Sequence, residues 1–433
     1  MIPRHLNLKK NVIFALVAFG VNIGLVFISY RLLILQGGIQ AVGLWSTLFA
    51  WTSLIRIGDV GMANATIRFA AMHDMESESE KIREYVETGI ISNGALFCFL
   101  AVLGYIVFSN FVGGLVEQTH VAEAEQVLPV MFGGFFLMNF ANVILGSIQG
   151  LHLGFVNSQL TVLGNLVQIG AAVFLVPRYG VLGMAWAQVI QYSSMSVVGW
   201  YVARRAVSSR NIVPARFSIP AFREMLGFSL RSQVANVSNG LFEPLSKILV
   251  SHFGGLQVQG LYELAYKTLW LPRTAVISGV SAMIPSLTHL FRTDREKLWP
   301  IYSKSVTYST LAVLALSIGA VVASPVISWL WIGRVEINYT YFVAIFAVGI
   351  VLNAFGAAAY NLAIVTGELR YNIVINVLVL ATLAVLGGIC GYFLPIHAVV
   401  AATAFSMGAG GLAIKFHNER LLQPGRASGG LNA

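Results

Sequence analysis

Nine charged residues of this sequence lie within long apolar stretches, where a charge needs a chemical reason. A charged side chain at the centre of a membrane-spanning helix costs roughly 2.5–3.5 kcal/mol on insertion scales. Three of the nine are acidic and six are basic: Asp59, Glu243 and Glu263 against Arg31, Arg56, Arg231, Lys247, Lys267 and Arg273. Because the bases outnumber the acids, we expect some of them to bind an anionic substrate in a cationic cavity.

The spacing of the three acids offers them a simpler role. Residues three or four apart lie on the same face of a helix and can form ion pairs. Three pairs have this spacing: Glu243 with Lys247, Glu263 with Lys267, and Arg56 with Asp59. Each acid is therefore predicted to hold a neighbouring base in place, and a role of the acids as proton carriers in coupling stays open beside it.

Arg56 and Arg273 are the strongest candidates for contact with the substrate. Each lies about halfway along its expected helix, and a shift of 217 positions places one on the other. The planar arginine fork can bind two phosphate oxygens and stays charged at any working pH. Arg31 and Lys247 are expected nearer the outer end of their helices, and Arg231 nearer the inner end.

Uncharged polar residues extend the expected cavity. Asn236 and Asn239 belong to a polar stripe that also contains Glu243 and Lys247. Its residues recur at intervals of three or four positions. Such a stripe is predicted to line a water-filled space, with the two asparagines in a supporting role. Trp270 continues a polar face of the next helix, where stacking on a sugar ring and packing in the core are equal alternatives.

The composition places these residues in a membrane. The chain has 433 residues, of which 57% are hydrophobic and 10% charged, against about 25% charged in soluble domains. The net charge of +9 has its explanation in Lys and Arg on cytoplasmic loops, so no nucleic-acid partner is expected. No nucleotide-binding motif, nucleophile elbow or metal-ligand spacing is present, so neither a cofactor, a metal site nor enzyme activity is expected.

Apolar blocks of about twenty residues or more predict an all-α polytopic membrane protein with twelve transmembrane helices. They are expected near 11–36, 41–68, 84–110, 127–149, 154–177, 181–203, 223–251, 257–290, 303–333, 338–366, 369–393 and 395–416. With cytoplasmic N- and C-termini, most loop Lys and Arg residues fall on the inner side. The acidic run from Asp74 to Glu87 falls there too and is predicted to be a solvated surface.

The two halves of the chain repeat each other. The shift of 217 positions aligns Gly37-Gly38 with Gly254-Gly255, and Gly150 with Gly367. We expect two six-helix lobes related by a pseudo-two-fold parallel repeat, 1–203 and 223–433, joined by a basic cytoplasmic linker, 204–222. Transporters of this kind alternate access by rocking one lobe against the other, and Pro244 and Pro272 are expected to permit kinks.

The segment Gly43-Leu44-Trp45, followed by Asp59-Val60-Gly61 and residues 63–68, resembles the second-helix signature of the polysaccharide transporter family, the Wzx-type O-antigen flippases. That family belongs to the multidrug, oligosaccharidyl-lipid and polysaccharide exporter superfamily. The resemblance implies a flippase of the bacterial inner membrane. It would move an undecaprenyl-pyrophosphate-linked oligosaccharide from the cytoplasmic to the periplasmic leaflet, among membrane lipids and with a polysaccharide polymerase or chain-length machinery as a partner. In relatives, helices 1, 2, 7 and 8 line the cationic cavity.

Two other classes of protein compete with a flippase. A cation-coupled multidrug exporter of the same superfamily would present carboxylates to a cationic drug, whereas bases outnumber acids in this cavity. A membrane enzyme such as a polymerase or ligase usually has a large outer loop, and the longest one expected here, near 111–126, is short. The balance of these features favours the flippase.

Overall fold

The computed structural model describes residues 8–73, 77–207, 213–281, 283, 287–288, 290–291, 295–366, 368 and 370–420. In this part of the chain all regular structure is helical, which confirms the all-α class. The elements are α1 (Leu8–Leu54), the 3-10 turn η2 (Ile55–Gly58), α2 (Met62–Ala71), α3 (Ser79–Leu115), the 3-10 turn η3 (Gln118–His120), α4 (Val121–Gly150), α5 (Gly154–Ala206), α6 (Ile219–Gly240), α7 (Phe242–Ser281), α9 (Arg295–Ile332), α10 (Ile337–Thr366), α11 (Arg370–Phe393) and α12 (Ile396–Glu419).

Three of these helices are folded in two at a glycine. α1 turns at Gly38 (φ 68°, ψ −168°), α5 at Gly180 (φ 56°) and α7 at Gly255 (φ 72°, ψ 179°). Glycine adopts a positive φ without the steric cost that a Cβ atom imposes. Gly38 and Gly255 are 217 positions apart and have nearly the same dihedral angles, so the repeat in the sequence extends to the backbone.

The folded helices are long enough to cross a membrane twice. The apolar segment Leu16–Gly58 has 43 residues and Gly154–Ala206 has 53, or about 65 and 80 Å of helix against roughly 30 Å of hydrocarbon. They belong to eight described helices that are long and apolar enough to span a membrane. Two of the eight cross twice, which makes ten spans. α6 followed by the first arm of α7 corresponds to one more, and the second arm of α7 to the twelfth.

The helix predicted over 41–68 is interrupted near its middle. α1 ends at Leu54, η2 follows, and α2 begins only at Met62. The Asp59 carboxylate accepts a hydrogen bond of 2.8 Å from the N–H of Gly61, whose φ is 76°. The prediction of one continuous helix is wrong because Asp59 and Gly61 supply the acceptor and the positive φ of a turn.

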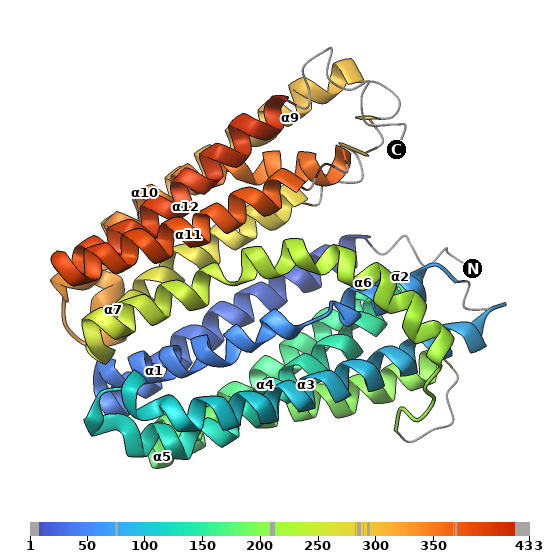
Figure 1. Cartoon of the computed structure of the whole chain (residues 1–433), viewed down its shortest axis with the longest axis horizontal. Coiled ribbons are helices and arrows are strands. Elements are labelled where there is room, and N and C mark those ends of the chain that lie inside the picture. The colour runs from blue at the N-terminus through green and yellow to red at the C-terminus, as the bar shows by residue number, and fades with distance from the viewer. Residues whose placement is uncertain are drawn as a thin grey trace. The chain divides into compact units, whose positions relative to one another are not determined.

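The chain divides into two compact units, Met1–Val237 and Ser238–Ala433. Within the first unit, α5 packs on α1 and α4, and α4 packs on α2 and α3 (Figure 1). Met225 of α6 is buried in a cluster with Met62 and Phe69 of α2. The boundary between the units therefore lies after most of α6, whereas the sequence predicts a boundary between lobes at 204–222.

The connection between α5 and α6 is attached to α3 by a buried carboxylate. Glu87 accepts hydrogen bonds from the backbone N–H groups of Ala215 (3.1 Å) and Arg216 (2.8 Å) and from Nε of Arg83 (2.9 Å). Thr88 accepts another from the N–H of Ser218. The Glu87 side chain is fully buried, so the prediction of a solvated acidic surface is wrong at this residue.

We expect Glu87→Gln to loosen this connection. Glutamine keeps the shape of the side chain but loses the charge that binds Arg83, at a cost of about 1–3 kcal/mol. Thermal unfolding of the purified protein in detergent measures the loss as a lower unfolding temperature. Glu84→Gln, three residues earlier on α3, is the matched control, and equal unfolding temperatures for both variants would contradict the prediction.

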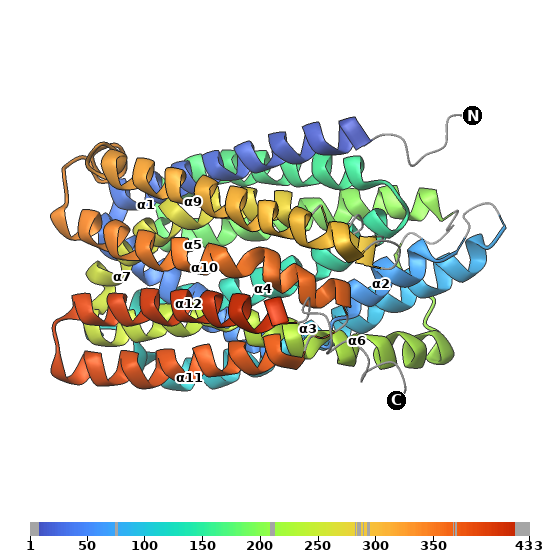
Figure 2. The same ribbon diagram turned by 90° about the horizontal axis from the view of Figure 1, so that it is seen from above.

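In the second unit, α10 packs on α7, α9 and α12, and α11 packs on α7 and α12. Figure 2 shows α9, α10, α12 and α11 side by side in that order. A Cβ atom at Gly356 would lie 2.5 Å from the carbonyl oxygen of Gly411, and one at Gly349 would lie 2.5 Å from that of Ala404. Small residues permit such close approach between membrane helices. The α10–α12 pair forms a tightly packed wall of this unit.

Candidate functional site

The folded helix α7 brings four charged residues together. Lys247 Nζ lies 2.7 Å from Glu243 Oε1 and 2.8 Å from Glu263 Oε2. Lys267 Nζ lies 3.2 Å from Glu243 Oε1 and 3.8 Å from Glu263 Oε1. Lys247 and Glu263 are each eight residues from the turn at Gly255, and Glu243 and Lys267 are each twelve from it. The antiparallel arms therefore place the charges opposite each other.

These four residues, Glu243, Lys247, Glu263 and Lys267, are named the ion quartet. The side chains of Lys247 and Glu263 are 2% and 1% exposed, whereas Glu243 and Lys267 are partly exposed. The two positive charges balance the two negative ones, as buried charges require. Both predicted i,i+4 pairs are confirmed, and pairs between the arms add to them. Contact of either lysine with a substrate stays a prediction.

Arg273, on the second arm of α7, is held by two neighbours. One Nη donates a hydrogen bond to Oδ1 of Asn353 in α10, and Nδ2 of Asn353 donates to the carbonyl of Met407 in α12 at 3.0 Å. The guanidinium carbon lies 4.5 Å from the centre of the Trp270 ring, within the range of a cation–π contact. Its Nε is buried and has no hydrogen-bond partner among the described residues. Arg273 is thus oriented, with one donor left over.

Trp270 belongs to an aromatic stack that ends at Arg273. The ring centres of Tyr262 and Tyr266 are 6.3 Å apart, and those of Tyr266 and Trp270 are 5.1 Å apart, with nearly parallel planes. The spacing of four residues places the three rings along one face of α7. Of the two roles left open for Trp270, these contacts favour packing, because Tyr266 and Arg273 both engage its ring.

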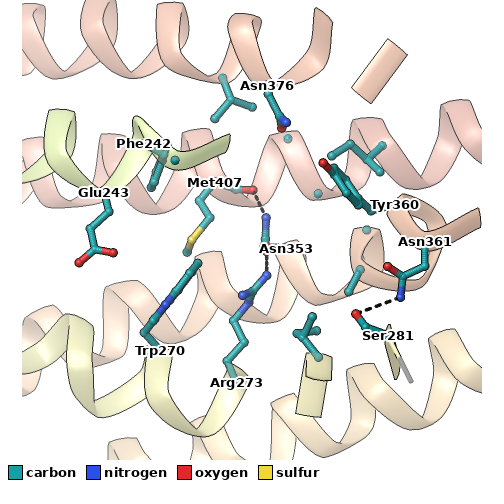
Figure 3. Close-up of a pocket in the computed structure, with 18 of the residues that line it drawn as sticks. Phe242, Glu243, Trp270, Arg273, Ser281, Asn353, Tyr360, Asn361, Asn376 and Met407 are labelled. Carbon is teal, nitrogen blue, oxygen red and sulfur yellow. Dashed lines mark hydrogen bonds between the residues drawn. The ribbon is translucent and has the colours of Figure 1, made fainter. Parts of the chain in front are cut away.

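A cavity of about 530 Å³ lies beside Arg273 within the second unit, inside the range of roughly 300–1,000 Å³ for small-molecule sites. α7, α10, α11 and α12 contribute to its wall. Figure 3 shows Arg273 and Asn353 between Glu243 and Trp270 on one side and Tyr360 and Asn361 on the other. Its polar lining includes Glu243, Arg273, Asn353, Tyr360, Asn361 and Asn376. No group of three or more His, Cys, Asp or Glu side chains fit for a metal ion occurs in the described part of the chain.

Three asparagines line this cavity that the pattern of charged residues in the sequence did not identify: Asn353, Asn361 and Asn376. Nδ2 of Asn361 donates to the Ser281 hydroxyl at 3.3 Å, and Asn353 holds Arg273. Nδ2 of Asn376 is buried and has no partner among the described residues. Because a membrane interior offers no water to a polar group, amides in the otherwise apolar helices α10 and α11 are the signal that could have identified them.

The predicted site residues of the first unit have different surroundings. Arg56 lies in η2 with an exposed side chain. Asp59 caps the turn at Gly61 instead, and no Arg56–Asp59 ion pair forms between these two described residues. Arg31 is half-buried in the first arm of α1. The other three candidates are in α6, and the boundary after Val237 places the last of them in the second unit. Their side chains lie outside the described residues: Arg231, Asn236 and Asn239.

A family model described as "Polysaccharide biosynthesis protein" matches residues 95–335, which is more than half of the chain. The chain belongs to the polysaccharide biosynthesis protein family. The matched part runs from α3 to the end of α9, so it contains the ion quartet and Arg273. Membership in this family confirms the resemblance found in the sequence.

A curated relative of this polysaccharide biosynthesis protein is the "Probable low-salt glycan biosynthesis flippase Agl15" of Haloferax volcanii. The two chains are 23% identical over 157 residues, which make up 36% of this chain and 33% of the relative. The match therefore spans a third of the relative's length.

Solved transporters share the fold of this polysaccharide biosynthesis protein. An inward-facing multidrug resistance MATE family transporter of the MOP superfamily superposes with a TM-score of 0.77 and 16% identity, over 92% of this chain and 94% of that one. A MOP superfamily transporter from Pyrococcus furiosus, described by the reverse polarity of its binding pocket, gives a TM-score of 0.69 and 15% identity, over 96% and 95%. Identities this low establish the fold alone. The chain thus has a fold that solved membrane transporters also have, and its apolar helices are those of a multi-pass membrane protein.

Proposed function

We propose that this protein is a flippase for a polyprenyl-diphosphate-linked oligosaccharide. It would carry an undecaprenyl-pyrophosphate-linked unit of a surface polysaccharide such as O-antigen from the cytoplasmic to the periplasmic leaflet of a bacterial inner membrane. The family and the transporter fold support the movement of a glycan. The observation that carries the substrate class is Arg273, a guanidinium in the cavity of a membrane-spanning unit that keeps an unpartnered donor.

A diphosphate head group needs such a site. The idealised cost of moving an isolated ion from water into an apolar medium is tens of kcal/mol, so it crosses a membrane only along a polar path. An arginine compensates the charge and binds two phosphate oxygens at once. We propose Arg273 and its repeat equivalent, Arg56, as the main phosphate ligands. Further contacts along the path are proposed for Arg31, Arg231, Lys247 and Lys267.

The repeat supports a mechanism by alternating access. We propose lobes over 1–203 and 223–433 that move about the linker 204–222, with both termini in the cytoplasm, where the basic loops are expected. Asp59, Glu243 and Glu263, together with Asn236 and Asn239, would support the cavity or its coupling. A polysaccharide polymerase or chain-length protein on the periplasmic side would receive the glycan.

The alternative is a cation-coupled multidrug exporter, which the MATE neighbours also suit. Such a pump presents a carboxylate to a cationic drug. The carboxylate that lines the cavity is Glu243, and its Oε1 lies 2.7 and 3.2 Å from two lysine ammonium groups. Because those lysines already neutralise it, the cavity favours an anionic ligand over a cationic one.

Purified protein in lipid vesicles tests this choice of substrate. One preparation contains a fluorescent polyprenyl-diphosphate-linked oligosaccharide, and another contains a lipophilic fluorescent cation. We expect the protein to transfer the glycan lipid between leaflets and to leave the distribution of the cation unchanged. Transfer of the cation alone would establish the exporter instead.

A further inference from the structure

Part of the cavity in the second unit forms a cup of uncharged polar groups next to Arg273. Asn361 and Tyr360 come from α10 and Asn376 comes from α11, and Figure 3 shows all three away from Glu243. Their side chains are named the amide cup. Asn361 keeps its carbonyl oxygen as an acceptor, because its Nδ2 already bonds to Ser281. The cup thus offers both donors and acceptors.

Three donors on residues that line this cavity have no partner among the described residues. They are Nε of Arg273, Nδ2 of Asn376 and the hydroxyl group of Tyr266, and the Asn376 residue is only 9% exposed. Buried N–H groups in folded proteins are almost always hydrogen-bonded, and an exception needs an explanation. Three unpartnered donors on residues of one cavity are explained by a ligand that is rich in acceptor oxygens.

The remaining lining describes the shape of that ligand. Ile277, Val379 and Ile414 present apolar surface in the same cavity. A pyranose ring matches such a wall, because its C–H groups are apolar and its hydroxyl groups donate and accept hydrogen bonds. A cavity of about 530 Å³ has room for one sugar with a phosphate, not for a whole oligosaccharide.

We propose that this cavity binds a glycosyl phosphate, with the phosphate on Arg273 and the attached sugar in the amide cup between Asn361 and Asn376. The inference rests on the proposed flippase function and deepens it. The protein would recognise the first sugar of the glycan, the one joined to the phosphate, within the second unit.

Binding by the full-length protein in lipid nanodiscs tests the subsite. Calorimetric titrations compare inorganic phosphate with a panel of soluble hexose and N-acetylhexosamine 1-phosphates. We expect the best sugar phosphate to bind about tenfold more tightly than phosphate, and Asn376→Leu to remove most of this advantage while changing phosphate affinity less than about twofold. Asn361→Leu is the second variant, should Asn376→Leu fail to fold.

Gln259→Leu is the matched control, because Gln259 is a fully buried amide of α7 outside the cavity. This variant should keep the preference for the sugar phosphate. No preference in the wild type, or an equal loss for phosphate and sugar phosphate in the asparagine variants, would overturn the subsite. A protein that transports the lipid-linked glycan without this preference refutes the subsite alone, and one that has the preference but transports no glycan refutes the flippase function alone.

Discussion

Lys247→Met is expected to lower the unfolding temperature of the protein by roughly 10 °C. Lys247 is 2% exposed and lies within 2.8 Å of two carboxylates. Removing one partner of a buried ion pair costs about 3–5 kcal/mol, because the remaining charge stays buried without compensation. For a unit of this size, 1 kcal/mol corresponds to about 2–4 °C. The stability of the folded hairpin of α7 is therefore expected to depend on Lys247.

Lys267→Met is the control, because it removes the same charge from the ion quartet at a less buried position. Lys267 binds the same two carboxylates at 3.2 and 3.8 Å and is 19% exposed. Its loss should lower the unfolding temperature by less than half as much, since water reaches the site. Thermal unfolding in detergent measures both variants, and equal effects would contradict the assigned difference in burial.

The double variant Lys247→Met with Glu263→Gln tests whether these two buried charges stabilise each other. Glu263 is 1% exposed, so its charge becomes the main cost once Lys247 is gone. Neutralising it should recover most of the lost stability, because removing both partners of a buried pair is nearly neutral in other proteins. If the double variant lost more stability than Lys247→Met alone, Lys247 and Glu263 would not interact.

Local spacing predicted much of this molecule. Gly37-Gly38 and Gly254-Gly255 indicated the turns between the first two helices of each half, and the structure has them at Gly38 and Gly255. The i,i+4 spacing of Glu243 and Lys247 indicated their ion pair. These features depend on a few neighbouring residues, so short patterns are sufficient to predict them.

Features that depend on contacts between distant segments escaped the same reasoning. Glu87 is buried because residues 215 and 216 return to α3 after more than 120 positions. Asn353 acquires its role only because α10 packs between Arg273 and α12. Arg56 differs from its repeat equivalent, Arg273, because a turn at Asp59 interrupts one helix and not the other.

Arg273→Gln is expected to reduce glycan translocation about 10- to 100-fold. Glutamine can still bond to Asn353, but it loses the positive charge and the fork that binds phosphate. A hydrogen bond to a charged group is worth about 1.5–3 kcal/mol, and each 1.4 kcal/mol is a factor of ten. Arg273→Lys keeps the charge but not the fork, so its translocation rate should lie between those of the wild type and Arg273→Gln.

A matched control comes from another arginine. Arg334 lies between α9 and α10, is 65% exposed and forms an ion pair with Glu336. Arg334→Gln removes the same charge from the chain and should leave translocation unchanged. The comparison separates a local role of Arg273 from a change in net charge.

The rate of glycan translocation in reconstituted vesicles tests the central claim most directly. Wild type, Arg273→Gln and Arg334→Gln are inserted at equal density with a fluorescent polyprenyl-diphosphate-linked oligosaccharide, and the fraction of lipid that reaches the opposite leaflet is followed over time. The account predicts rapid transfer by the wild type and by Arg334→Gln, and transfer near the protein-free background by Arg273→Gln. Equal rates for Arg273→Gln and wild type would contradict it.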